Sequence, residues 1–139
     1  MDQAKIIEII NENQDGAFFV GKADENCVRG IEERLNVSLS ISYKWFLKEF
    51  GHGGFNGVEV LGSGLSVIPT CVIETEDWRN FELPQEYVVI ENSGSGAIYC
   101  LDTSRMSNNE CPVIMWTQYD GVIGPIFNNF YEFLFYRFI

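Results

Sequence analysis

The spacing of apolar residues changes at Gly51, and this change limits the chain to a fold that combines helices with a sheet. Before Gly51, apolar residues recur at every third or fourth position, which is typical of helices with one buried face. After it they alternate with polar residues or form short runs between Gly, Pro, Asn and Asp, as strands do. Helical spacing returns at Phe130. The chain should therefore place helices first, strands next and one helix last.

Four helices are predicted from this pattern and from its end signals. Asp2 and Asp24 stand near the positive ends of the first two, Ser40 or Ser42 begins the third, and Asn128 or Asn129 caps the last. Gly51 lies where a left-handed residue would end the third helix. The predicted helices cover residues 2–12, 24–35, 40–50 and 130–138.

The region between Gly51 and the last helix is predicted to form strands and turns. The clearest unit is a hairpin over residues 87–101, whose two apolar runs flank a turn rich in Ser and Gly. Residues 70–86, rich in Glu, Asp and Asn, are expected to form a loop that holds a short helix around residues 74–80. Residues 18–20 fit either a strand or a packed loop. The other predicted strands are 58–61, 65–68 and 111–116.

This order of elements predicts an α+β fold and a single domain over residues 1–139. At 139 residues and 46% hydrophobic composition, the chain suffices for one core but is too short for two ordinary domains. We expect an antiparallel meander sheet packed by N-terminal helices and a C-terminal helix. That last helix is apolar nearly all round, so one flank could serve a partner or a homodimer. Packing between the sheet and the first helix is the alternative that we favour.

The net charge of −11 limits the kinds of partner that the protein can bind. Direct binding to nucleic acid or to an anionic membrane is disfavoured, because both need clustered Lys and Arg. A basic protein partner is favoured, although acidity could also serve solubility alone. Residues 1–69 hold six Lys and Arg against ten acidic residues, whereas residues 70–139 hold three against ten. An electrostatic recognition surface is therefore expected in the second half.

We expect neither a catalytic nor a metal centre. The single histidine, His52, follows a helix in a Gly-rich exit, where a polar turn residue is ordinary. The four cysteines lack zinc-site spacing, and calcium-loop and phosphate-loop patterns are missing. Gly62-Ser63-Gly64 is interpreted as a turn, because Pro69 soon after it argues against a following helix. We therefore expect no cofactor.

The cysteines and the apolar runs also indicate where the protein works. Nothing at the N-terminus resembles a signal peptide, and no apolar run approaches the roughly 20 residues that a membrane span needs. The thiols are therefore expected to be reduced and mostly buried in a cytoplasmic protein. They are Cys27, Cys71, Cys100 and Cys111.

Two neighbouring segments resemble the SUKH superfamily, also described as Smi/Knr-like. The first is Gly30-Ile31-Glu32-Glu33-Arg34-Leu35, and the second runs from Ser42-Tyr43-Lys44-Trp45-Phe46-Leu47 to the Gly-rich exit. The later strands and the closing Phe130-Tyr131-Glu132-Phe133-Leu134 fall where that family has its strands and final helix. One departure is Leu39-Ser40-Ile41, where the family more often has Leu-Pro. The resemblance covers nearly the whole chain and is closest to YobK-type bacterial immunity proteins.

The resemblance implies a non-enzymatic protein that binds another protein. Immunity proteins of the family bind and neutralise a cognate toxin, often a nuclease, whereas fungal cell-wall regulators act as signalling or scaffold proteins. A nuclease is basic where it holds phosphate, so we expect the acidic surface to dock there or on a neighbouring face. Trp78 is the expected aromatic anchor, with plugging of the sheet edge as its alternative role. The candidate partner-binding residues are Glu74, Glu76, Asp77, Trp78, Glu82, Glu91 and Asp120. Reversing the charges of Glu76 and Asp77 together should slow association.

Overall fold

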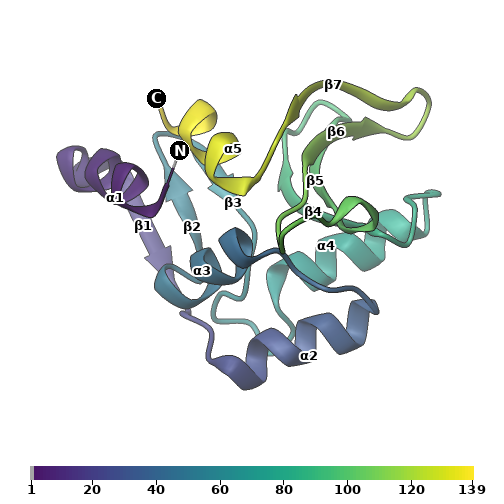
Figure 1. The fold of residues 1–139 in the computed structure, drawn as a ribbon, viewed down its shortest axis with the longest axis horizontal. Helices are drawn as coiled ribbons and strands as arrows, with labels where there is room; N and C mark the ends of the chain where they lie inside the picture. The colour runs from purple at the N-terminus through teal and green to yellow at the C-terminus, as the bar shows by residue number, and fades with distance from the viewer. Residues whose placement is uncertain (1) are drawn as a thin grey trace.

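The computed structural model describes residues 2–139, and its strands form two antiparallel sheets, as Figure 1 shows. The three-stranded sheet has the order β1-β2-β3, and the four-stranded sheet has the order β4-β5-β6-β7. The sheets meet where the Leu61 N–H donates to the Ile90 carbonyl at 2.8 Å. The strands are β1 (Ala17–Val20), β2 (His52–Phe55), β3 (Val58–Val60), β4 (Tyr87–Asn92), β5 (Ile98–Asp102), β6 (Val113–Thr117) and β7 (Gly121–Phe127).

The predicted helices are confirmed to within two residues at each end. The caps are those that the sequence indicated: Asp2, Asp24, Ser40 and Asn129 each accept a hydrogen bond from a backbone N–H three residues later. Short 3₁₀ turns, η1 (Gln14–Gly16) and η2 (Thr103–Arg105), follow α1 and β5. The helices are α1 (Gln3–Glu12), α2 (Glu25–Leu35), α3 (Ile41–Glu49), α4 (Thr70–Arg79) and α5 (Phe130–Phe138).

Helix α5 lies between the two sheets and beside α1, so the packing that we favoured for it is confirmed (Figure 1). Its Phe138 ring lies 4.7 Å from that of Phe55 on β2, and its Phe133 ring lies 5.1 Å from that of Tyr99 on β5. Rings of this size bury enough apolar area to join the two sheets into one core. The α+β class is confirmed, with the expected meander divided into two sheets.

Helices α4 and α5 cover opposite faces of the four-stranded sheet. Tyr99 and Trp116 project from opposite faces, because Trp116 pairs across the strands with Ile98, the neighbour of Tyr99. Tyr99 packs on α5, whereas Trp116 packs on Trp78 of α4 at 6.1 Å. The hairpin predicted over residues 87–101 is confirmed as β4 and β5. Every residue of β5 is buried, as expected for a strand that is covered on both faces.

Two predictions for the middle of the chain were wrong. Residues 65–68 do not form a strand, and Leu65 and Val67 are exposed. Residues 70–86 are not mainly a loop, because α4 begins at Thr70, directly after Pro69. Pro69 is the residue before the first turn, where its missing N–H costs nothing, so it starts the helix that we took it to exclude.

Two strands were missed because glycine hides their pattern. The run taken for a helix exit, Gly51 to Phe55, contains β2, and the stretch after Asp120 contains β7. Glycine in β2 is imposed by packing, since a Cβ added to Gly53 would lie 2.1 Å from the Phe18 carbonyl oxygen of β1. The close approach of β1 to β2, and not strand propensity, therefore requires glycine at position 53.

Candidate partner-binding surface

Five of the seven candidate residues come from helix α4, from the residues after it and from the β6–β7 turn. Asp77 and Trp78 lie in its last turn, Glu82 lies just beyond it, and Glu74 lies one turn before Trp78. The β6–β7 turn supplies Asp120, because that turn and Trp78 line the same hollow. We call these five residues, with the exposed rings of Phe81 and Tyr119, the α4 surface.

Trp78 is held in one orientation by contacts on three sides. Its ring meets Trp116 edge-on, with the ring centroids 6.1 Å apart and an angle of 86° between the planes. Its Nε1–H donates to the Glu74 carboxylate at 3.2 Å, and the Asn92 side chain donates to the same carboxylate oxygen at 2.7 Å. Phe81 lies beside it, 6.1 Å away. Trp78 is therefore half-buried and already ordered. An aromatic anchor of this kind loses little conformational entropy when a partner binds.

Two shallow hollows flank Trp78. One of about 200 Å³ is lined by Asp77, Trp78, Phe81 and Gln118. The other, of about 280 Å³, lies towards the β4–β5 and β6–β7 turns and reaches Tyr119 and Asp120. Trp78 and Gln118 line both, so the hollows are neighbours. Because Phe81 is 53% exposed and Tyr119 94% exposed, the surface combines large rings with carboxylates.

Sequence reasoning missed Phe81, Gln118 and Tyr119. Phe81 and Tyr119 stand between polar neighbours, and an isolated aromatic ring in such a stretch is a signal for an exposed ring at a turn. Gln118 gives no such signal. What joins the three residues is the approach of the end of α4 to the β6–β7 turn, which only the fold reveals.

Two of the three arginines of the second half, Arg79 and Arg137, are engaged by other groups of the fold. Arg79 donates from Nη2 to the Leu35 and Gln85 carbonyls at 2.9 and 2.7 Å, so this nitrogen is occupied by the backbone. Burial lowers the pKa of its guanidinium. Arg137 is engaged by Glu91. In the part of the chain that the structure describes, neither of these two arginines forms a salt bridge with Asp77 or Asp120.

Glu76 lies on a different side of α4 from the rest of the surface. Arg34 of α2 donates to both of its carboxylate oxygens, at 2.8 and 2.9 Å. The hydrogen bond from Arg34 holds the pKa of Glu76 below its ordinary value. Because both side chains remain partly exposed, this pair contributes little stability, but it joins α2 to α4.

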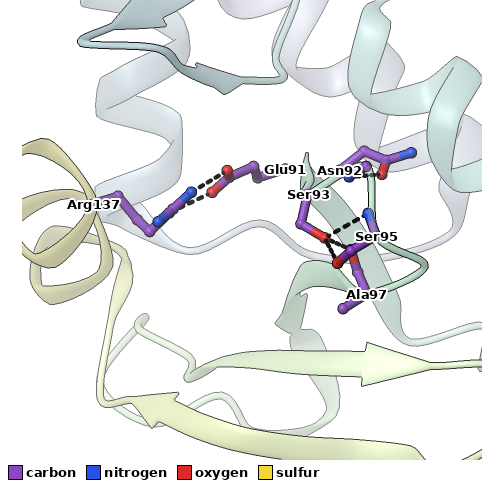
Figure 2. Close-up of polar contacts among 7 residues, drawn as sticks. Glu91, Asn92, Ser93, Ser95, Ala97 and Arg137 are labelled. Atoms are coloured by element: carbon purple, nitrogen blue, oxygen red, sulfur yellow. Dashed lines mark hydrogen bonds and ion pairs between the residues drawn. The ribbon is translucent and has the colours of Figure 1, made fainter.

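Glu91 is buried inside the fold and is not part of the α4 surface. It is 4% exposed, and Arg137 of α5 donates to its two oxygens at 2.8 and 2.6 Å (Figure 2). The Arg137 guanidinium lies 5.3 Å from the centroid of the Tyr99 ring. The hydrogen bond to Glu91 raises the pKa of Arg137. Glu91 is therefore not available to a partner.

His52 contacts a hydroxyl and a carboxylate. Its Nδ1 lies 2.8 Å from Thr70 Oγ1, and its Nε2 lies 3.5 Å from Glu59. The Thr70 hydroxyl is occupied by the backbone, because it lies 2.9 Å from the Gly62 nitrogen and 3.0 Å from the Gly62 oxygen. This arrangement ties the loop after β3 to β2 and to the start of α4.

Cys71, Cys100 and Cys111 are buried, Cys27 is half-buried, and all four are free thiols, as the sequence indicated. Burial raises the pKa of Cys71 and of Cys111 to about 12. Within residues 2–139, His, Cys, Asp and Glu side chains form no cluster that could hold a metal ion. Over the same range, every helix is too short or too polar to cross a membrane.

These features define a small α+β domain with two linked antiparallel sheets and an acidic, aromatic surface at one end. A solved structure of a protein from Pseudomonas syringae pv. tomato has the same fold, with a TM-score of 0.69 and 16% sequence identity over 91% of this chain and 93% of that one. The family model SUKH_5, described as SMI1-KNR4 cell-wall, matches residues 3–139. The chain therefore belongs to this family, and the resemblance to the SUKH superfamily is confirmed.

Proposed function

We propose that this protein is an immunity protein, which binds a cognate toxin through the α4 surface and neutralises it. The observation that carries the proposal is the position of Asp77 and Asp120, which line the two hollows that flank Trp78. Family membership supports it, because immunity is one of the two roles that the resemblance implies. The protein acts by binding alone, without a catalytic centre.

A nuclease is the class of toxin that this surface fits best. A nuclease must present Lys and Arg where it holds phosphate, and the partner of such a site gains speed and specificity from carboxylates. The carboxylates of the α4 surface would steer the encounter. Trp78, Phe81 and Tyr119 would set the lifetime of the complex, since buried aromatic anchors dominate the energy of most interfaces.

The proposal is tested by co-expressing the chain with the toxin domain encoded beside its gene. We expect cells to survive, and the two purified proteins to form a complex. The Trp78→Ala variant should reduce both effects, while Trp45→Ala, on the far helix α3, serves as the matched control. Death of cells that carry the folded wild-type chain, with no complex in vitro, would overturn the proposal.

A regulatory scaffold is the second candidate function, and the cell-wall description of the matching family favours it. A scaffold would bind a protein of its own cell and would give no protection from a toxin. The co-expression experiment separates the two roles, because protection is expected only of an immunity protein.

A homodimer formed through the exposed part of α5 is a further expectation. The molar mass of the purified protein in solution tests it.

A further inference from the structure

We infer that the hollow formed by Asp77, Trp78, Phe81 and Gln118 is a binding site for one arginine side chain of a basic protein partner. This inference deepens the proposed function and rests on it for the identity of the partner.

Two aromatic rings, those of Trp78 and Phe81, line the hollow. Trp78 and Phe81 are tilted by 66° with their centroids 6.1 Å apart. The indole N–H is already donated to Glu74, so the π system of Trp78, and not its polar edge, remains for a ligand. An occupant must therefore have a flat or apolar portion that packs on rings.

The rim of the hollow selects for a cation. Asp77 is the charged residue among the four described lining residues and is exposed, and Gln118, which also lines the hollow, carries an amide oxygen. Among the salt bridges of residues 2–139, none involves Asp77. The charge of the nearest arginine in sequence, Arg79, is turned towards carbonyls elsewhere. The rim thus holds a carboxylate that the protein itself does not neutralise.

Arginine meets both requirements better than lysine. Its guanidinium is planar and weakly hydrated, stacks on aromatic faces, and keeps donors at its edge for a carboxylate and an amide oxygen. An ammonium group is compact and strongly hydrated, so it would lose more hydration in a hollow walled by rings. An apolar side chain would fill the hollow but would leave Asp77 without a counter-charge.

The site can be tested without the toxin. The probe is N-acetyl-arginine amide, titrated into the ¹⁵N-labelled full chain while the indole N–H signals of the three tryptophans are followed. Trp78→Phe identifies the Trp78 signal. We expect a saturable shift of that signal alone. N-acetyl-lysine amide should bind at least about threefold more weakly, and N-acetyl-leucine amide should give no saturable shift.

Two variants test whether the Asp77 carboxylate contributes to arginine binding. Asp77→Asn should weaken the binding of the arginine probe about two- to fivefold, as expected for the loss of an exposed ion pair. Glu86→Gln, an equal change of charge outside the hollow, should leave the affinity unchanged. An equal response to lysine, or no response of Trp78, would overturn the arginine site even if the toxin is bound. Arginine binding together with failed protection would instead refute immunity and leave the site standing.

Discussion

Arg137 on α5 donates one hydrogen bond to each carboxylate oxygen of Glu91 on β4, and this pair links the last helix to the four-stranded sheet. Breaking this pair from the arginine side should destabilise the protein, because the Glu91 carboxylate would stay buried without a partner. For Arg137→Met we expect a loss of about 2 to 4 kcal/mol, near the lower end for buried pairs since Arg137 is itself 27% exposed. The measurement is the free energy of unfolding in urea.

The matched control for that prediction is Arg34→Met, which breaks the exposed pair with Glu76. It should cost clearly less than Arg137→Met does, because exposed ion pairs contribute little to stability. If both variants unfold at the same urea concentration, Arg137 and Glu91 do not join α5 to the sheet as the structure indicates.

The pair of Glu76 with Arg34 should make a small contribution to stability that depends on pH. The pKa of Glu76 is lower in the folded protein than its ordinary value of 4.5, so the folded state favours the ionised carboxylate. The contribution is therefore present above about pH 4.5 and is lost as the pH falls through the folded pKa. At pH 7, the free energy of unfolding of the wild type should exceed that of Glu76→Gln by no more than about 1 kcal/mol. A difference that grows towards acid pH would have the wrong sign.

Glu82 adopts a left-handed backbone conformation, with a φ of +74°, three residues after the end of α4. Leu83 N–H donates to the Trp78 carbonyl across this residue, in the helix-ending motif that usually has glycine there. Glu82→Gly should therefore raise the free energy of unfolding by about 0.5 to 1 kcal/mol. Glu33→Gly, inside α2, is the control and should lower it by about 0.5 kcal/mol. Equal losses from the two variants would contradict the strain at Glu82.

The thiols should react slowly while the protein is folded. Burial raises the pKa of all four, most for the fully buried ones, so thiolate is scarce at pH 8. With a coloured disulfide reagent, we expect slow labelling of Cys27 alone in the native protein and labelling of four thiols in guanidinium. Rapid native labelling of two or more thiols would show that the core opens readily.

The helices could be predicted from sequence because their signals are local. Caps such as Asp24 and Ser40, together with helical spacing of the buried residues, define α2 and α3 without knowledge of the rest of the chain. Helix α4 was underestimated because only Cys71, Val72 and Thr75 are fully buried on it, and its charged residues obscure that face. Strand β2 was missed because it contains two glycines, and Gly53 is required by the close approach of β1 and not by strand propensity.

Sequence reasoning found part of the α4 surface, but not its arrangement and not Phe81, Gln118 or Tyr119. Acidic composition drew attention to residues 74–82, and Trp78 was the evident aromatic ring among them. The sequence could not separate Glu91 and Glu76, which pair with distant arginines, from Asp77, which remains exposed. Such pairing depends on contacts between residues more than 40 positions apart in the chain, so only the fold reveals it.

The most direct test of the central claim is the rate at which the protein associates with its cognate toxin at several salt concentrations. If the α4 surface steers the encounter, Asp77→Lys combined with Asp120→Lys should slow association at least about tenfold at low salt and flatten its salt dependence. Glu12→Lys combined with Asp15→Lys makes the same change of net charge at the end of α1 and should have a much smaller effect. Equal slowing by both pairs would show that only net charge matters, and unchanged rates in the first pair would contradict the account.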